Sequence, residues 1–168
     1  MEKFKKNNSY WNKFYKNSFI EIPTQFAVFV ATYLKPPSTI IDLGCGNGRD
    51  TIFLSNNNFK VIGVDLSIGA INACNKKKQN NNLVFYCKDI SDKNFIQTIN
   101  KILKKKIFSS SKTVNYYSRF VMHSINKKQQ VNFMLILKDL MKPGEKIFFE
   151  FRFRRDRNTK KIFQNHYR

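Results

Sequence analysis

Acidic residues are scarce in this sequence of 168 residues: 11 Asp and Glu stand against 31 Lys and Arg, and the formal net charge is +20. Cysteine is rarer still. The chain has Cys45, Cys74 and Cys87 and no CxxC pair. An odd number of cysteines without such a pair argues against both a disulfide framework and a zinc site. We therefore predict no bound metal and a reducing, cytoplasmic setting.

Long apolar runs are also missing. No run approaches the ~20 residues that a membrane-spanning helix needs, and the basic N-terminal stretch MEKFKKNNSYW is not followed by the apolar stretch of a signal peptide. The chain is nevertheless 42% hydrophobic and 15% aromatic, which excludes intrinsic disorder. The length fits one domain with a substantial core. We expect a soluble protein that stays in the compartment where it is made.

The positive charge has two readings. A basic surface attracts nucleic acids and phosphorylated ligands. Much of the charge, however, lies in short lysine runs at residues 76–78 and 104–106, inside polar stretches of a sequence biased toward Lys, Asn, Ile and Phe. Solvated helix ends and loops account for such runs without any partner. The composition favours the second reading but does not decide between them.

Apolar runs and polar helical stretches alternate from about residue 38 onward. Five runs are expected as strands, at residues 39–43, 60–65, 82–87, 112–120 and 146–153. The stretches between them predict helices at 49–56, 68–77, 92–103 and 126–141, with Ser67, Asp92 and Asn126 as N-caps. This alternation predicts an α/β fold with a parallel sheet covered on both faces and right-handed crossovers.

An aromatic-rich segment precedes the first expected strand. Residues 23–34 predict an amphipathic helix that leads to the stop at Pro36 and Pro37. The aromatic side chains either pad the sheet or form a lid over a ligand, and the sequence leaves both readings open. We divide the single domain into a helical cap (1–37), a core (38–153) and a basic tail (154–168).

The segment DLGCGNGRD, residues 42–50, follows the first expected strand and opens the next helix. Gly44 and Gly46 allow a sharp turn with no Cβ between the backbone and a ligand. The following helix N-terminus supplies free N–H groups and a partial positive charge. Asp65 ends the second expected strand, where a carboxylate can accept hydrogen bonds from both hydroxyls of a ribose. Together these features predict a nucleoside site.

The stretches IIDLGCGNGRDTIFL (40–54) and VIGVDLS (61–67) resemble the glycine-rich first motif and the acidic second motif of the class I S-adenosylmethionine-dependent methyltransferases. The resemblance continues through KDI (88–90), YSRFVMHSI (117–125) and MKPGE (141–145). The N-terminal YWNKFY…IPTQFAVFV and the closing EFRFRRD…HYR are similar to a bacterial stand-alone subgroup of small-molecule and surface-polysaccharide pathways. The likeness covers nearly the whole chain and implies a Rossmann-like three-layer sandwich with a mostly parallel sheet.

The resemblance also implies roles for individual residues. S-adenosylmethionine is the implied cofactor and S-adenosylhomocysteine the product. The implied cofactor-binding residues are Asp42, Gly44, Cys45, Gly46, Asn47, Gly48, Asp65, Leu66, Asp89, Ile90 and Phe120. Among these, Asp42 would orient the loop and approach the cofactor amino group, and Asp65 would take the ribose hydroxyls. Capping of a loop remains an alternative role for each of the three aspartates.

The expected acceptor site lies after the fourth strand. His123 is the best candidate for the base, because its ordinary titration range suits proton transfer near neutral pH; a purely structural histidine is equally compatible. Arg119 would lie beside the transferable methyl group. The remaining substrate-binding candidates are Tyr10, Trp11, Tyr15, Arg152, His166 and Arg168. The arginines suit an anionic substrate through bidentate contacts, although Arg152 also fits a solvated strand position.

The sequence argues against two classes of DNA methyltransferase. The segment SRFVMHSI contains no proline, whereas amino-directed DNA methyltransferases carry an Asn/Asp-Pro-Pro-aromatic motif there, and no cysteine has the proline neighbour of the cytosine-C5 enzymes. The sequence favours a methyltransferase acting on a small molecule, such as a sugar or polysaccharide precursor. The alternatives are an RNA methyltransferase and a non-catalytic module that binds a cofactor or a partner. Nicotinamide-dependent oxidoreduction is disfavoured by the GxGxG spacing.

Family members usually continue past the fifth strand with a helix and two more strands, whereas only residues 156–168 follow here, so we expect a C-terminally truncated fold. The fifth strand would then present an unpaired edge. A natural fragment, a split gene and pairing of that edge with another chain in an oligomer all account for this.

Overall fold

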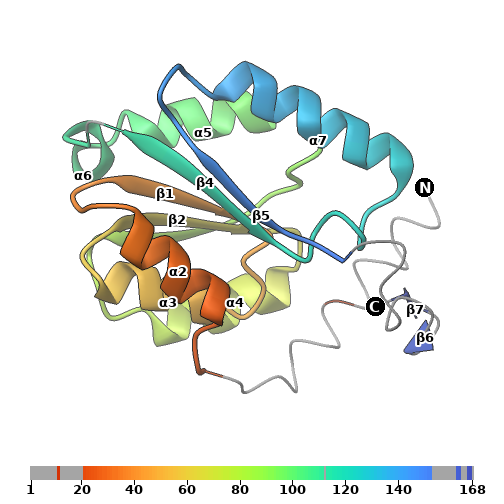
Figure 1. The fold of residues 1–168 in the computed structure, drawn as a ribbon, viewed down its shortest axis with the longest axis horizontal. Coiled ribbons are helices and arrows are strands. Elements are labelled where there is room, and N and C mark those ends of the chain that lie inside the picture. The colour runs from red at the N-terminus through yellow and green to blue at the C-terminus, as the bar shows by residue number, and fades with distance from the viewer. Residues whose placement is uncertain (1–10, 12–20, 112, 153–161, 164–165, 168) are drawn as a thin grey trace.

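The computed structural model describes Trp11 and residues 21–111, 113–152, 162–163 and 166–167. Its centre is a sheet of five strands, all parallel to their neighbours, in the order β3-β2-β1-β4-β5 (Figure 1). The strands are β1 (Thr39–Leu43), β2 (Lys60–Asp65), β3 (Leu83–Cys87), β4 (Val114–Arg119) and β5 (Ile147–Glu150). The predicted α/β class and the Rossmann-like layering are confirmed.

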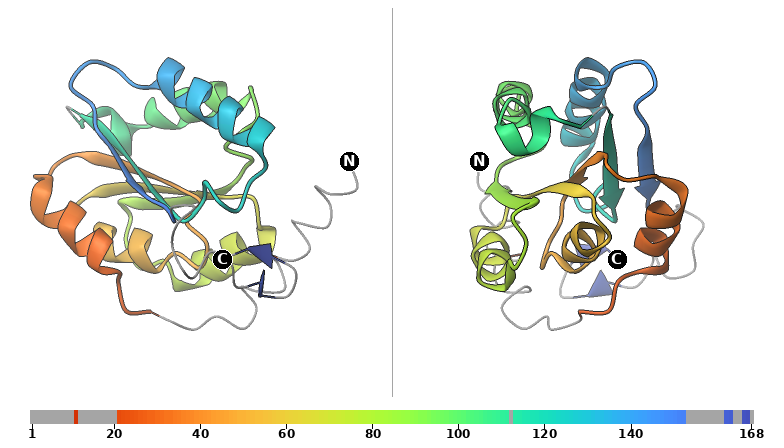
Figure 2. Two further views of the ribbon diagram at one scale, coloured as in Figure 1. Left: turned by 45° about the vertical axis from the view of Figure 1, so that its right-hand side comes forward. Right: turned by 90° about the vertical axis from the view of Figure 1, so that its left-hand side faces the viewer.

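Helices cover both faces of this sheet. One face carries α2 (Gln25–Tyr33), α3 (Arg49–Asn56) and α4 (Ile68–Lys77), and the other carries α5 (Phe95–Leu103), α6 (Lys106–Ser109) and α7 (Lys127–Leu140). The two layers lie on opposite sides of the strands in all three ribbon views (Figures 1 and 2). The sheet is therefore the middle of three layers.

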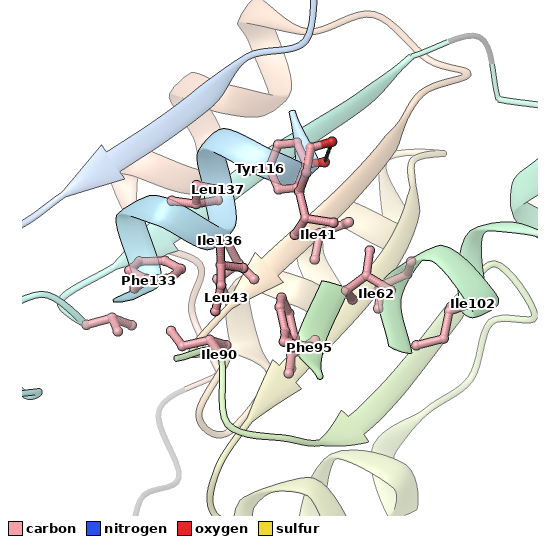
Figure 3. Close-up of a cluster of buried hydrophobic side chains, with 14 of the residues drawn as sticks. Ile41, Leu43, Ile62, Ile90, Phe95, Ile102, Tyr116, Phe133, Ile136 and Leu137 are labelled. Carbon is pink, nitrogen blue, oxygen red and sulfur yellow. Dashed lines mark hydrogen bonds between the residues drawn. The ribbon is translucent and has the colours of Figure 1, made fainter. Parts of the chain in front are cut away.

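Alternating side chains along the strands supply the two cores, as the two-residue period of a strand requires. In β1, Ile41 and Leu43 face the α5–α7 layer, whereas Ile40 faces α3 and α4. In β4, the neighbours Tyr116 and Tyr117 separate in the same way. Figure 3 shows the first core, where the strand residues meet Phe133, Ile136 and Leu137 of α7. A one-residue slip of register would exchange these two faces.

Two of the three predicted helix caps are present, and one is wrong. The Ser67 hydroxyl accepts from the Ala70 N–H at the start of α4. Asn126 forms a capping box with Gln129 at the start of α7. Asp92 does not cap α5, which begins three residues later at Phe95. Its carboxylate instead accepts from the Asn94 N–H (2.8 Å), so it closes a turn that leads into the helix.

The last two strands are shorter than predicted. β4 ends at Arg119, because Phe120 has a φ of +59°, which no strand residue adopts. β5 has four residues and pairs only with β4 among the described strands, so the predicted open edge is present. The short helix α6 was not predicted. The strands β6 (Ile162–Phe163) and β7 (His166–Tyr167) pair antiparallel with each other.

The aromatic residues of α2 pad the sheet. The α2 residue Phe26 lies 5.2 Å from the ring of Tyr117. Phe29 and Tyr33 meet the ring of Phe148 edge-on, at 6.4 and 5.5 Å between centroids. Of the two readings offered by the sequence, padding holds for this helix. None of the described helices is both long and apolar enough to cross a membrane.

Candidate functional site

A cavity of about 420 Å³ opens at the carboxyl ends of the strands. It lies beside the ends of β1 and β4, where the strand order reverses, which is the usual ligand position in open α/β sheets. Its size is within the range of small-molecule sites. The cavity is lined by 14 of the residues singled out in the sequence: Trp11, Asp42, Gly44, Cys45, Gly46, Asn47, Asp65, Leu66, Asp89, Ile90, Arg119, Phe120, His123 and Arg152.

The turn after β1 begins with a residue that must be glycine. Gly44 has a φ of +87°, and a Cβ at this position would lie 2.1 Å from the Cγ2 atom of Val121. Its N–H donates to the carbonyl of Val64 (2.8 Å), as does the N–H of Cys45 (3.0 Å). The turn is thereby held against β2 on one side and against the segment after β4 on the other.

Gly48 does not line the cavity, contrary to the expectation from the motif. It is the N-cap of α3 with a φ of +77°. A Cβ here would meet the Cys74 thiol at 2.7 Å and the ring of Phe85 at 3.2 Å. The third glycine of the motif therefore lets α3 approach α4 and β3, and its role is packing.

Asp65 joins the end of β2 to the glycine turn. Its Oδ2 atom accepts from the Gly46 N–H at 2.9 Å, and its Oδ1 atom accepts from the Ser67 N–H at 2.8 Å. Burial raises the pKa of this carboxyl above its ordinary value, and the backbone N–H donors partly offset the shift. Each oxygen of a carboxylate can accept a second hydrogen bond. Asp65 can thus hold the loop and still accept from ligand hydroxyls.

Asp42 is buried near the end of β1, two residues before Gly44. Its Oδ2 atom accepts from the Thr51 hydroxyl at 2.6 Å. Burial raises the pKa of Asp42 to about 8, with smaller contributions from the carboxylates of Asp50 and Asp65. At neutral pH the carboxyl is protonated in large part, and a cationic group entering the cavity would favour its ionised form.

Asp50 is a cavity residue that the sequence reasoning missed. Its carboxylate accepts from the Thr24 N–H and hydroxyl, both at 2.9 Å, and from the Tyr117 hydroxyl at 2.8 Å. Burial is the main cause that raises the pKa of Tyr117, so this hydroxyl remains a donor. The signal was an acid in the first turn of the helix after the glycine motif. Its partners lie 26 and 67 residues away and could not be read from the sequence.

Cys45 and Asp89 have structural contacts as well as cavity positions. Burial and the neighbouring Cys74 raise the pKa of the Cys45 thiol well above its ordinary value, so it is no nucleophile. The Cys74 thiol donates to the carbonyl of Gly46 (3.3 Å). Asp89 accepts from both the N–H (2.8 Å) and the hydroxyl (2.7 Å) of Ser91. The loop-forming role left open for Asp89 is present together with its cavity position.

The opposite side of the cavity is built around Phe120. The backbone N–H of this residue donates to the carbonyl of Glu150 (2.7 Å), which holds the segment after β4 to β5. The Arg119 guanidinium lies 3.9 Å from the Phe120 ring centroid and forms an ion pair with Glu150. The Arg152 guanidinium lies 5.4 Å from the same ring. Two cations therefore flank one aromatic ring.

His123 faces this cluster, with its ring 5.4 Å from that of Phe120. Its Nδ1 atom is buried and has no hydrogen-bond partner among the described residues. Burial lowers the pKa of His123, and the positive charge of Arg152 lowers it further. The ring is therefore neutral at pH 7, with a nitrogen available to accept a proton.

The remaining predicted site residues are not placed. Tyr10, Tyr15 and Arg168 lie outside the described residues, and for His166 the structure describes the backbone alone, in β7. The sequence reasoning also missed other cavity-lining residues. These are Arg49, Asp50, Lys88, Tyr117, Val121, Ser124, Ile125 and Gln129.

A family model described as "Methyltransferase domain" matches residues 34–161. The chain is also similar to the solved S-adenosylmethionine-dependent methyltransferase from Anabaena variabilis (25% identity, TM-score 0.65), covering 84% of this chain and 58% of that one. It has the same fold as the N-methyltransferase NodS from Bradyrhizobium japonicum in complex with S-adenosylhomocysteine (16% identity, TM-score 0.55), covering 73% of this chain and 57% of that one. A Pyrococcus horikoshii protein also shares this fold (20% identity, TM-score 0.57), covering 77% of this chain and 52% of that one.

The chain spans between half and three fifths of the length of these three solved proteins. No curated protein matches the sequence at a significant level. The family match covers most of the chain, including the glycine turn, both acidic strand ends and the segment after β4. The chain belongs to the methyltransferase-domain family and has the Rossmann-like fold of its class I members.

Proposed function

We propose that this protein binds S-adenosylmethionine and transfers its methyl group to a small-molecule acceptor. One observation carries the proposal: Asp42, the glycine turn and Asp65 line one cavity at the carboxyl ends of β1 and β2. These groups suit the cofactor. A carboxylate at the tip of β2 suits ribose hydroxyls, a turn without Cβ suits a ligand lying against it, and a buried acid suits an amino group.

The chemistry of such a site falls mainly on positioning and on one proton transfer. When bound, S-adenosylmethionine supplies a methyl group on a sulfonium, which activates it for in-line displacement. The chain's residues have to align the acceptor and, for a hydroxyl or protonated amine, remove a proton. His123 is our candidate for the base, because its ring lines the cavity and its pKa is lowered below the ordinary value.

Small acceptors are favoured by the cavity volume of about 420 Å³ and by the proteins that share this fold. They include a glycopeptide N-methyltransferase in complex with S-adenosylmethionine (14% identity, TM-score 0.56). Arg119 ends β4, Phe120 and His123 follow it, and the arginine is neutralised by Glu150. The basic surplus of the sequence keeps RNA as the alternative acceptor, and the test separates the two.

The test uses purified full chain with S-adenosylmethionine carrying a labelled methyl group. We expect label in the small-molecule fraction of a cell extract and none in the RNA fraction. The His123→Gln variant should lose turnover by about 10²–10⁴-fold while it keeps the wild-type affinity for S-adenosylhomocysteine. The exposed Lys138→Gln variant, on the outer face of α7, serves as the control.

The outcomes have separate meanings. Label in RNA alone would identify an RNA methyltransferase. Affinity for S-adenosylhomocysteine without transfer to either fraction would identify a non-catalytic cofactor-binding module. Absence of any affinity for S-adenosylhomocysteine would overturn the proposal as a whole. Full activity of His123→Gln would remove His123 as the base.

A further inference from the structure

The carboxylates that line the cavity lie on one side of it, with Arg49 and Lys88 among them, and Arg119 and Arg152 lie on the other side. The carboxyl ends of β1, β2 and β3 bring Asp42, Asp65 and Asp89 to it. The end of β4 and the segment after β5 bring Arg119 and Arg152. Because β1 to β3 form one half of the sheet and β4 and β5 the other, the acids and these arginines lie on opposite sides.

The two arginines differ in what neutralises them. Arg119 pairs with Glu150, its register partner on β5. Arg152 has no ion pair and no hydrogen bond to any residue that the structure describes; its recorded contact is with the ring of Phe120. Arg49 also lines the cavity, but it lies at the start of α3 on the acidic side, 3.8 Å from the carboxylate of Asp50. Arg152 is thus the uncompensated cation on the β4–β5 side.

The contact with Phe120 explains how an unpaired arginine is held in place. A guanidinium over an aromatic ring is attracted by the face of the ring, while its N–H groups remain available in its own plane. Those N–H groups match the geometry of a carboxylate or phosphate and bind it through two parallel hydrogen bonds. The ring therefore attracts the guanidinium without using its N–H donors.

We propose that Arg152 binds an anionic group, a carboxylate or a phosphate, on the acceptor molecule. That the anion belongs to a methyl acceptor rests on the proposed function. That Arg152 binds an anion does not depend on it. An acceptor bound in this way presents its hydroxyl or amine near His123, whose ring shares the Phe120 cluster. The acceptor oxygen or nitrogen forms a bond to the methyl carbon as the carbon–sulfur bond breaks. The sulfur keeps that electron pair, and the acceptor proton passes to the neutral imidazole ring of His123, which lines the cavity.

The experiment titrates the protein, without cofactor, with sodium phosphate and separately with sodium acetate at constant ionic strength. NMR signals of the His123 ring report binding, and the His123→Gln variant identifies them against those of His166. We expect saturable shifts in the wild-type protein, with the tighter of the two anions identifying the acceptor group. The variant Arg152→Gln should bind at least tenfold more weakly, because a charged hydrogen-bond donor is lost.

Two further variants control the result. Lys138→Gln removes the same charge from the exposed face of α7 and should bind as the wild type does. Arg152→Lys keeps the charge but loses the planar fork, so its affinity should fall between those of the wild type and Arg152→Gln. This variant also keeps the test decisive if Arg152→Gln does not fold.

The inference is overturned if neither anion moves the His123 signals, or if the two Arg152 variants bind anions as tightly as the wild type does. Calorimetry with S-adenosylhomocysteine on the same samples tests the proposed function separately. We expect wild-type affinity for it in Arg152→Gln, since this residue lies on the acceptor side. Anion binding without affinity for S-adenosylhomocysteine would retain the site and remove the methyltransferase proposal.

Discussion

Two single positions shape the acidic side of the cavity. At Gly44 the backbone adopts a left-handed conformation and leaves no space for a side chain beside Val121. At Asp42 a carboxyl group is buried beneath the same turn with Thr51 as its hydrogen-bond donor. The residue at position 44 is restricted by the space available, and the protonation of Asp42 is set by the cost of burying a charge. We therefore expect the first to respond to added side-chain volume and the second to pH.

The substitution Gly44→Ala should be far more damaging than Gly144→Ala. Both residues have a positive φ near +87°. A side chain in this conformation costs roughly 1–2 kcal/mol at each position. Gly44→Ala also drives its Cβ into Val121, which adds about 1–3 kcal/mol, whereas Gly144 has nothing within 4 Å. Urea unfolding of the two variants measures the difference. Equal losses of stability would contradict the packing assigned to Gly44.

Ionisation of Asp42 should lower the stability of the protein as pH rises from about 4 to 8. The Asp42→Asn variant should lack this contribution to the pH dependence. The pKa of Asp42 is about 8 in the folded chain against an ordinary value of 3.8. Between these values the folded chain holds a proton that the unfolded chain has released, so raising the pH favours unfolding. Asparagine keeps an acceptor for Thr51 and does not ionise.

Denaturant unfolding at pH 5, 7 and 9 measures this effect. The free energy of unfolding of Asp42→Asn minus that of the wild type should increase with pH up to about pH 8. The Asp139→Asn variant, which removes an exposed carboxylate of α7, should follow the wild-type pH dependence. A constant difference between Asp42→Asn and the wild type across the three pH values would contradict the raised pKa.

At the scale of elements, sequence patterns located most helices and strands because each has a local cause. The predicted bounds of α3 and α4 match the structure, since the glycine motif starts one helix and Ser67 caps the other. The start of α5 was misplaced because Asp92 forms a turn by the same kind of hydrogen bond that a cap would make. A local pattern cannot distinguish these two uses of one carboxylate.

The capping box of α7 should contribute measurable stability. Asn126 accepts from the Gln129 N–H at 3.0 Å, and Gln129 accepts in return from the Asn126 N–H at 3.1 Å. Asn126→Ala removes the first of these bonds and should cost about 0.5–2 kcal/mol. Asn94→Ala is the matched control, because Asn94 occupies the same position of α5 without a side-chain cap. Equal effects of the two substitutions on urea unfolding would argue against the box.

The residues of the candidate site could be predicted on both sides of the cavity, but only some of the contacts between them could be. The glycine turn and Asp65 lie within 22 residues of one another and follow consecutive strands, so their meeting could be foreseen from the sequence. The ion pair between Arg119 and Glu150 depends on the register of β4 with β5, which joins residues 31 apart. The network around Asp50 depends on how α2 packs. Such contacts follow from tertiary packing that no local pattern encodes.

At the scale of the whole molecule, the open edge of β5 favours association with a second chain, and the net positive charge opposes it. An unpaired strand edge invites pairing with a second chain. Two chains that each carry a net charge of +20 repel one another at low ionic strength. Oligomer formation through β5 therefore stays a prediction that depends on salt, and the same repulsion acts within each chain.

The melting temperature should rise when sodium chloride is raised from 0.01 to 0.15 M. The screening length falls from about 30 Å to about 8 Å over this range, which weakens repulsion between the 31 basic residues more than it weakens the few ion pairs. Calorimetric melting at several protein concentrations separates this effect from association. A melting temperature that falls with salt would show that attractive pairs dominate.

The central claim is that the turn after β1 and the carboxylate at the tip of β2 hold an adenosyl ligand, and calorimetry with S-adenosylhomocysteine tests it most directly. We predict binding of one molecule per chain to the wild type and to the exposed-site variant Asp139→Asn. Asp65→Asn should bind at least tenfold more weakly, because its charged acceptor is lost, and NAD⁺ should give no heat. Absence of heat with the wild-type protein, or unchanged affinity in Asp65→Asn, would contradict the account.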